Sequence, residues 1–285
     1  TMSALQNKID FAIVLRVKNA NPNGDPLNGN RPRTDYSGLG EITDVCLKRK
    51  LRDRLQEAGL SIFVQSDDRR RDDYKSLAQR AKGILGDKLG GAETAQLACA
   101  TWFDVRAFGQ LFAIKGGAKK AKKKGDPTEE SDGDTGISIG IRGPVTIQSA
   151  FSVEPVSVTS TQITKSVSGD GDGSKRGSDT MGMKHRVDHG IYVSYGSINP
   201  QLAERTGFSA EDAELIKTWL PKLFENDASS ARPDGSMEIL KVIWWKHPNK
   251  GQLSAAKVHG SLTVRPDGLI ELADIGITPE VIEGY

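Results

Sequence analysis

The run Phe11–Val17 (FAIVLRV) is rich in β-branched and other apolar residues, which is typical of a mostly buried β-strand. It is followed by Asn19–Gly40, a segment dense in Asn, Pro and Gly that predicts a long loop. Loops of this length inside a folded domain usually carry function. We therefore expect binding residues in this loop.

Two segments have the spacing of amphipathic helices. In Glu41–Ala58 the apolar residues recur on one helical face, namely Leu47, Leu51, Leu55 and Ala58. In Ser209–Phe224, Ser209 and Asp212 have the spacing of a capping box, while Pro221 is expected to bend or weaken the last turns. Each segment therefore predicts a helix with one face on the core.

Further apolar runs predict strands at Val145–Val153, Ile191–Ile198 and Glu238–Lys246, with a terminal strand at Val258–Arg265. Without the intervening insertions, the order is strand, helix, strand, strand, helix, strand. This βαββαβ order is that of the ferredoxin-like unit, which RNA-recognition folds also use. The sequence therefore predicts an α+β fold with a ferredoxin-like (RRM-like) palm.

Two insertions interrupt this order. The first contains helical candidates at Tyr74–Leu89 and Glu93–Phe103, then Lys115–Gly136, whose six lysines and five acidic residues predict an exposed, mobile loop. The second predicts a hairpin arm with a Gly- and Ser-rich tip. The expected parts are palm at 9–71, 141–153 and 190–266, a helical finger insertion at 72–140, a thumb-like arm at 154–189 and an acidic tail at 267–285.

Charge and cysteine content narrow the class of protein. The net charge is +2, yet residues 267–285 contain five acidic residues and no Lys or Arg, so the rest of the chain is basic, as in many nucleic-acid binders.

Cys46 and Cys99 form neither a zinc motif nor a disulfide framework. No apolar run approaches the ~20 residues of a membrane span. We expect a cytoplasmic protein with no membrane partner.

The first predicted helix carries cations beside its leucine stripe. With the leucines on the core, Lys48, Arg49 and Arg52 fall together on the opposite flank, close in sequence to Arg31 and Arg33. Guanidinium and ammonium groups in such a row can follow a phosphate backbone. The alternative is an ordinary solvated helix face balanced by nearby acidic residues.

Three other segments suggest RNA contacts. Asn21 and Asn23 can offer amides to RNA, or belong to an ordinary multi-turn connection. The octamer 106–113 (RAFGQLFA) matches part of an RNP1 motif, including Arg106 and Phe108, although an aromatic packed at a helix end is the alternative. In the arm, Met181 and Met183 flank cationic residues and could wedge between bases, or pack in a core.

Enzyme signatures are absent from the sequence. Residues 170–181 begin like an EF-hand loop but lack its glycine and closing glutamate, and His185 and His189 do not form a zinc motif. No Walker, dinucleotide or nucleophile-elbow motif is present. We therefore predict no cofactor, no metal and no catalytic residue. Asp25 and Asp35 are the carboxylates to consider for metal-assisted phosphodiester cleavage.

Several short motifs, in order along residues 9–266, resemble a known family. They are NPNGDP (21–26), RPRTD (31–35), DVCLKR (44–49), DVRAFG (104–109), IRGP (141–144) with Gln148 and Ser149, and MGMKH (181–185). In these motifs the chain resembles the backbone subunits of type I-C CRISPR Cascade complexes, the Cas-seven group of the RAMP superfamily.

This resemblance implies a hand-shaped, non-catalytic subunit. Copies would stack head-to-tail along one guide RNA (crRNA), kink it with their thumbs and present it to a strand of target DNA. The other expected partners are further Cascade subunits and a recruited nuclease-helicase. Stacking of this kind is a heterologous contact that propagates as a helix.

The resemblance also assigns expected contacts. On the palm, the expected RNA-binding residues are Asn21, Asn23, Arg31, Arg33, Lys48, Arg49, Arg52, Arg106, Phe108, Arg142, Gln148 and Ser149. On the thumb they are Thr164, Lys165, Met181, Met183, Lys184, His185 and Arg186. Without support from a motif, we expect DNA contacts from Lys119, Lys120, Lys122, Lys123 and Lys124.

Two other functions stay open from the sequence. Type III relatives resemble this fold and cut RNA with an aspartate in the loop after the first strand, where Asp25 and Asp35 lie here. The chain would then be a metal-dependent ribonuclease. It could also be a generic single-strand RNA-binding or assembly protein.

Overall fold

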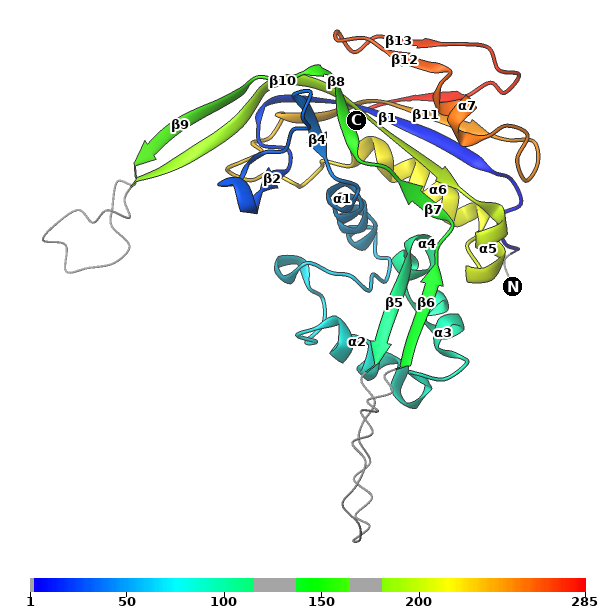
Figure 1. The fold of residues 1–285 in the computed structure, drawn as a ribbon. Coiled ribbons are helices and arrows are strands. Elements are labelled where there is room, and N and C mark those ends of the chain that lie inside the picture. Colours follow the sequence, from blue (N-terminus) through cyan, green and yellow to red (C-terminus); the bar gives the residue numbers. More distant parts are fainter. Residues whose placement is uncertain (1–2, 115–136, 165–180) are drawn as a thin grey trace, which may run out of the picture.

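The computed structural model describes residues 3–114, 137–164 and 181–285, which form a mixed α/β fold around a large antiparallel sheet (Figure 1). Its strands run in the order β14-β11-β1-β10-β8-β4, and β7 and β9 also pair with β10. The strands are β1 Ile9–Ala20, β4 Leu39–Ile42, β7 Val145–Ile147, β8 Ala150–Pro155, β9 Val158–Thr164, β10 Met181–Ile198, β11 Met237–Lys246 and β14 Glu280–Glu283.

Helices and two-stranded ribbons complete the described structure. The helices are α1 Asp44–Glu57, α2 Leu77–Leu85, α3 Thr94–Thr101, α4 Phe103–Phe108, α5 Pro200–Thr206, α6 Ala210–Trp219 and α7 Ala255–His259. Short 3-10 turns are η1 Pro26–Asn28, η2 Asp67–Arg69, η3 Gly86–Lys88 and η5 Leu220–Lys222. The ribbons pair β2 Gly24–Asp25 with β3 Arg31–Pro32, β5 Gly109–Ile114 with β6 Ile137–Arg142, and β12 Leu262–Val264 with β13 Ile270–Leu272. No helix in these described parts is long and apolar enough to cross a membrane.

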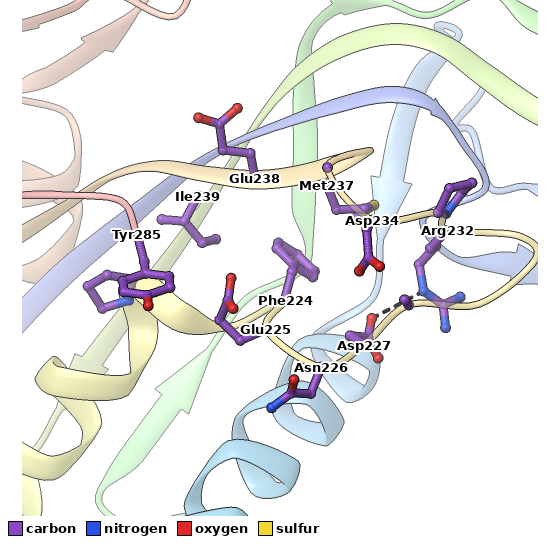
Figure 2. Close-up of a pocket in the computed structure, with 14 residues that line it drawn as sticks. Phe224, Glu225, Asn226, Asp227, Arg232, Asp234, Met237, Glu238, Ile239 and Tyr285 are labelled. Carbon is purple, nitrogen blue, oxygen red and sulfur yellow. Dashed lines mark hydrogen bonds and ion pairs between the residues drawn. The ribbon is translucent and has the colours of Figure 1, made fainter.

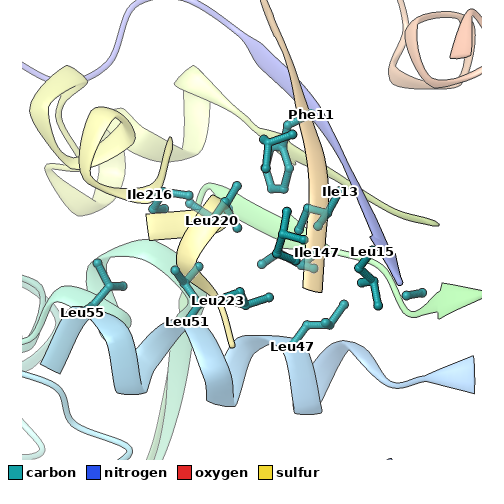
Figure 3. Packing of buried hydrophobic residues seen from close by; sticks show 14 of the residues in the cluster. Phe11, Ile13, Leu15, Leu47, Leu51, Leu55, Ile147, Ile216, Leu220 and Leu223 are labelled. Atoms are coloured by element: carbon teal, nitrogen blue, oxygen red, sulfur yellow. The ribbon is translucent and has the colours of Figure 1, made fainter. Parts of the chain in front are cut away.

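The inner face of the sheet holds the main core (Figure 3). Alternate residues of β1, including Phe11, Ile13 and Leu15, point to this face because side chains of a strand alternate between its two sides. They pack with the predicted stripe of α1, namely Leu47, Leu51 and Leu55, and with Ile216, Leu220 and Leu223. Both predicted helices are present but shorter than expected, because Glu41 and Ile42 belong to β4 and α6 ends at Trp219. The capping box of Ser209 and Asp212 is confirmed. In the predicted stripe of α1, Ala58 is the exception, because it follows the last turn and is exposed.

The outer face carries the other residues of β1, including Ala12 and Val14, and is covered at one end by α7, β12 and β13. The predicted strand Val258–Arg265 is wrong, because its first residues end α7 and only Leu262–Val264 is a strand. The predicted acidic tail is also part of the folded body: β13 pairs with β12, and β14 forms a sheet edge beside β11.

The first insertion has its own small core. Phe63 lies 4.7 Å from Trp102 and 5.3 Å from Phe112 between ring centroids. The predicted helices are shorter than expected, since α2 ends at Leu85 and α3 at Thr101. The β5–β6 ribbon was not predicted; it starts at Gly109, where φ is +82° and a Cβ would lie 2.2 Å from the Ile141 carbonyl oxygen.

The second insertion is a long hairpin, here called the arm, formed by β9 and residues 181–187 of β10. It extends away from the sheet, as Figure 1 shows. Residues 191–198, the predicted strand, continue the same β10 through the centre of the sheet. The predicted strand Val145–Val153 is interrupted at Gln148 and Ser149, and so forms β7 and β8.

Candidate nucleic-acid interface

The loop after β1 is held together by its own asparagines. Asn21 is buried, and its Nδ2 donates to the Asn30 carbonyl oxygen over 2.7 Å. Asn23 Oδ1 accepts from both the backbone N–H and the hydroxyl of Thr43, each over 2.9 Å. Of these two predicted RNA contacts, Asn21 therefore closes the loop on itself and Asn23 ties the loop to the start of α1.

The two carboxylates considered for catalysis cap backbone turns. Asp25 Oδ1 accepts from the N–H of Leu27 over 3.2 Å and lies 3.5 Å from Nη2 of Arg33. Asp35 Oδ1 accepts from the N–H groups of Ser37 and Leu39, each over 2.9 Å. In the described ranges, no group of three or more His, Cys, Asp or Glu side chains could hold a metal ion. Both carboxylates therefore have a role in shaping the loop.

The cations of α1 do not form the open flank that the helical spacing predicts. Lys48 pairs with Asp44 over 2.9 Å, and Arg49 pairs with Asp53 over 2.8 Å while donating to the Val64 carbonyl oxygen. Burial lowers the pKa of Arg49, and the neighbouring Asp53 opposes this shift. The flank packs on the segment after the helix, so its charges are largely satisfied within the chain.

Arg52 and Arg106 are also engaged. Arg52 Nε donates to Asp104 over 3.0 Å, and its guanidinium carbon lies 5.0 Å from the centre of the Phe108 ring. Arg106 binds both carboxylate oxygens of Asp212 at 2.9 Å. Arg106 and Phe108 belong to the helix α4, whereas the partial RNP1 match needs a strand throughout. The RNP1 interpretation is therefore wrong, because α4 turns into β5 only at Gly109.

The other predicted palm contacts, Arg142, Gln148 and Ser149, do not belong to the ion pairs of Arg52 and Arg106. Arg142 is exposed at the end of β6, and Gln148 is exposed between β7 and β8. The Ser149 hydroxyl accepts from the N–H of Asp44 over 3.3 Å. Arg142 and Gln148 are thus accessible to a ligand, while Ser149 contributes to the start of α1.

The structure brings Arg31 of β3 together with the arm. Arg31 Nη1 donates to the Ser160 hydroxyl over 2.9 Å and lies 3.4 Å from His185 Nδ1. The Ser160 hydroxyl and His185 Nδ1 are also 2.8 Å apart. Arg31 and His185, two predicted RNA contacts that are far apart in sequence, therefore lie together at the root of the arm.

Further out, the arm presents apolar and charged side chains to solvent. Met181 is 62% exposed and Met183 is 56% exposed. Thr164 and Lys184 are exposed as well, while Arg186 Nε lies 3.4 Å from Asp188. Lys165 and the lysines Lys119, Lys120, Lys122, Lys123 and Lys124 lie outside the described residues.

Two exposed side chains that face each other across strands on the outer face were missed by sequence reasoning. Lys18 of β1 lies directly opposite His189 of β10, and both are exposed. They continue the alternation of Val14 and Ile191, so they lie on the outer face beyond the part that α7, β12 and β13 cover. The alternation of FAIVLRVK already places Lys18 on one side, but pairing with residue 189 needs the sheet register.

A separate pocket of about 250 Å³ lies beside the start of β11 (Figure 2). Its lining includes the carboxylates of Glu225, Asp227, Asp234 and Glu238. Asp227 pairs with Arg232 over 3.2 Å. Because these carboxylates repel phosphate, and no predicted contact lines the pocket, we place the nucleic-acid interface elsewhere. The outer face and the root of the arm form the candidate interface.

Sequence comparisons give two matches of high coverage. The family model described as CRISPR-associated protein Cas7 matches residues 7–278. A protein of Haloferax volcanii described as CRISPR-associated protein Cas7 is 30% identical over 243 residues, which cover 83% of this chain and 69% of the relative.

Structural similarity is more distant. A chain of a CRISPR RNA-guided surveillance complex, pre-nicking, is 16% identical, with a TM-score of 0.46 over 84% of this chain and 75% of that chain. A chain of another CRISPR RNA-guided surveillance complex is 17% identical, with a TM-score of 0.41 over 92% of this chain and 77% of that chain. Because both TM-scores are low, the inference of family rests on the two sequence matches.

Proposed function

This chain belongs to the CRISPR-associated protein Cas7 family, and from that premise we propose that it is a non-catalytic backbone subunit of a CRISPR RNA-guided complex. The family match over residues 7–278 is the observation that carries the proposal. We assign it to type I-C on its motifs, chiefly NPNGDP (21–26), RPRTD (31–35) and MGMKH (181–185).

The proposed palm is ferredoxin-like. The antiparallel order β11-β1-β10-β8, with α1 and α6 on the inner face, supports this assignment because the six elements follow one another as βαββαβ. The arm would be the thumb. The exposed Met181 and Met183 of the arm support that role, since neighbouring exposed apolar side chains are typical of a binding surface.

We propose that the guide RNA crosses the outer face at the root of the arm. Lys18 and Lys184 would hold its phosphates there, with His189 and Arg186 beside them, and Arg31, Arg33 and His185 would contact it at the root of the arm. Lys48, beside the inner face, and Arg142 and Gln148, toward the other end of β10, would contact RNA away from the arm. Such contacts bind ribose-phosphate independently of sequence, as a subunit that serves any guide requires. Asn21, Asn23, Arg49, Arg52, Arg106, Phe108 and Ser149 would act indirectly, by holding the loop and α1 in place.

The proposed thumb would kink the RNA. Met181 and Met183 are flexible apolar side chains, which can insert beside a base and unstack it from its neighbour, while Lys184 keeps the backbone close. The displaced base would leave short runs of exposed guide for pairing with a strand of target DNA.

The remaining proposed partners follow from the binding of many copies of this chain along one RNA. A sequence-independent grip allows many copies to line up, and a head-to-tail contact between identical copies propagates as a helix. Other subunits of the complex would cap the two ends, and a nuclease-helicase would be recruited for cutting.

The proposal is tested by expressing the full chain with a repeat-spacer array and sequencing the RNA that co-purifies. We expect guide transcripts of one length class and assemblies of several copies on each RNA. Heterogeneous cellular RNA bound by single copies would favour the generic RNA-binding function. Absence of RNA from the purified chain would contradict both.

A further inference from the structure

Tyr36, the one aromatic residue in the sequence of the loop after β1, is fully exposed. Its relative exposure is 112%, so it has essentially no packing within the chain. Within the described parts of the protein, no aromatic or cation–π partner of Tyr36 is found. A tyrosine whose ring is fully exposed to solvent in this way is a candidate for ligand binding.

The turn that carries Tyr36 is held by several hydrogen bonds. The preceding Asp35 accepts from the N–H groups of Ser37 and Leu39, and its own N–H donates to the Leu39 carbonyl oxygen over 2.9 Å. Gly38 has a φ of +80°, which closes the turn. The ring is therefore presented on a fixed support, and a ligand would not have to order the loop.

This turn is attached to the root of the arm. The N–H of Val156 donates to the Gly38 carbonyl oxygen over 3.0 Å, and Leu39 pairs with Pro155. On the other side of the turn, β3 reaches the arm through Arg31 and Ser160. Tyr36 is thus held beside the candidate nucleic-acid interface by contacts on both flanks, with Arg33 three residues before it.

We infer that Tyr36 is a stacking platform for an unpaired nucleobase of the bound RNA, an inference that rests on the proposed function. Exposed aromatic rings beside cationic side chains bind single strands in this way, because every base has a π-face and the charges hold the backbone. The site would therefore contribute affinity without selecting a sequence.

The test measures binding of a fluorescent single-stranded RNA by the full chain and by the variants Tyr36→Ala, Tyr36→Phe and Tyr36→Leu at several salt concentrations. We expect Tyr36→Ala to weaken binding about 5- to 150-fold, from the usual free energy of one stacked base. Tyr36→Phe should bind like the unsubstituted chain, and Tyr36→Leu should be weak because it lacks a π-face. The salt slope should be the same for all, since no phosphate contact is removed.

Two controls separate stacking from other roles. An abasic oligonucleotide of the same length should bind Tyr36→Ala and the unsubstituted chain equally, and Tyr285→Ala, which removes an exposed tyrosine remote from the arm, should leave RNA binding unchanged. Equal RNA affinity of Tyr36→Ala and the unsubstituted chain would overturn the inference, as would loss of self-association on RNA with affinity intact, which indicates a protein contact. Failure of the unsubstituted chain to bind RNA would instead overturn the proposed function.

Discussion

Arg52 and Asp104 form an ion pair that joins α1 to the first insertion, with Arg52 Nε 3.0 Å from Asp104 Oδ2. The Asp104 side chain is 1% exposed and also accepts from the N–H groups of Phe63 and Val64. The pair therefore fixes both the helix and the segment that follows it. Arg52, which the helical spacing places in a row of cations expected to bind RNA, is therefore part of an ion pair inside the protein.

The first prediction concerns this ion pair. Arg52→Ala leaves a buried carboxylate without its counter-ion, so we expect the free energy of unfolding to fall by about 3–5 kcal/mol. Urea unfolding followed by circular dichroism measures it. The matched control is Lys48→Ala, whose more exposed pair with Asp44 should contribute at most about 1 kcal/mol. Equal unfolding midpoints for the two variants would contradict the structural role of Arg52.

The second prediction concerns the cations of the outer face and arm. Lys18→Ala and Lys184→Ala should each weaken RNA binding to a similar extent for unrelated sequences. Each should also reduce the slope of log affinity against log salt by about 0.7, the value for one phosphate contact on a single strand. Lys257→Ala, on the exposed side of α7, is the control and should leave the slope unchanged. If the salt slope changes in Lys257→Ala but not in Lys18→Ala or Lys184→Ala, the RNA binds elsewhere on the protein.

The third prediction concerns pH and His259. Burial lowers the pKa of His259 below its ordinary 6.5, although its contact with the Gly196 carbonyl oxygen and the nearby Asp10 oppose the shift. The unfolded state therefore binds the proton more readily, and the stability present above about pH 6.5 is lost as the pH falls below that value.

Urea midpoints measured between about pH 8 and about pH 5 test this sign. His259→Gln keeps a hydrogen-bond donor but does not titrate, so its stability should vary less over this range than that of the unsubstituted chain. A steeper dependence in the variant would mean that His259 is not the group responsible.

The fourth prediction concerns cleavage. Because Asp25 and Asp35 each cap backbone amides, we expect the assembled RNA complex to leave a matched RNA intact in Mg²⁺ or Mn²⁺. Gel analysis of labelled RNA is sufficient. Products at regular spacing that disappear in Asp25→Ala or Asp35→Ala would show a ribonuclease and contradict the non-catalytic assignment.

Local periodicity was sufficient to predict the elements that make the core. The apolar spacing of Leu47, Leu51 and Leu55 predicts which side of α1 is buried, and the capping box predicts where α6 begins. These features depend on neighbours within one or two turns. The β5–β6 ribbon could not be predicted from the sequence, because its strands are far apart in sequence and Gly109 is equally typical of a helix end.

The candidate site was harder to predict for the same reason. Sequence spacing can place Arg49 and Arg52 on one flank, but it cannot show that Asp104 lies opposite them. Similarly, Arg31 meets His185 only once the loop and arm have folded together, and Lys18 meets His189 only through the sheet register. Partners distant in sequence decide which cations are available to a phosphate.

Ultraviolet crosslinking of the full chain to bound RNA, followed by mass spectrometry of the crosslinked peptides, tests the central claim most directly. Crosslinks are expected in peptides that contain Lys18, Tyr36 and residues 181–189, at the root of the arm and on the outer face. Crosslinks confined to the acidic pocket beside β11 or to α7, with none at the root of the arm, would contradict it.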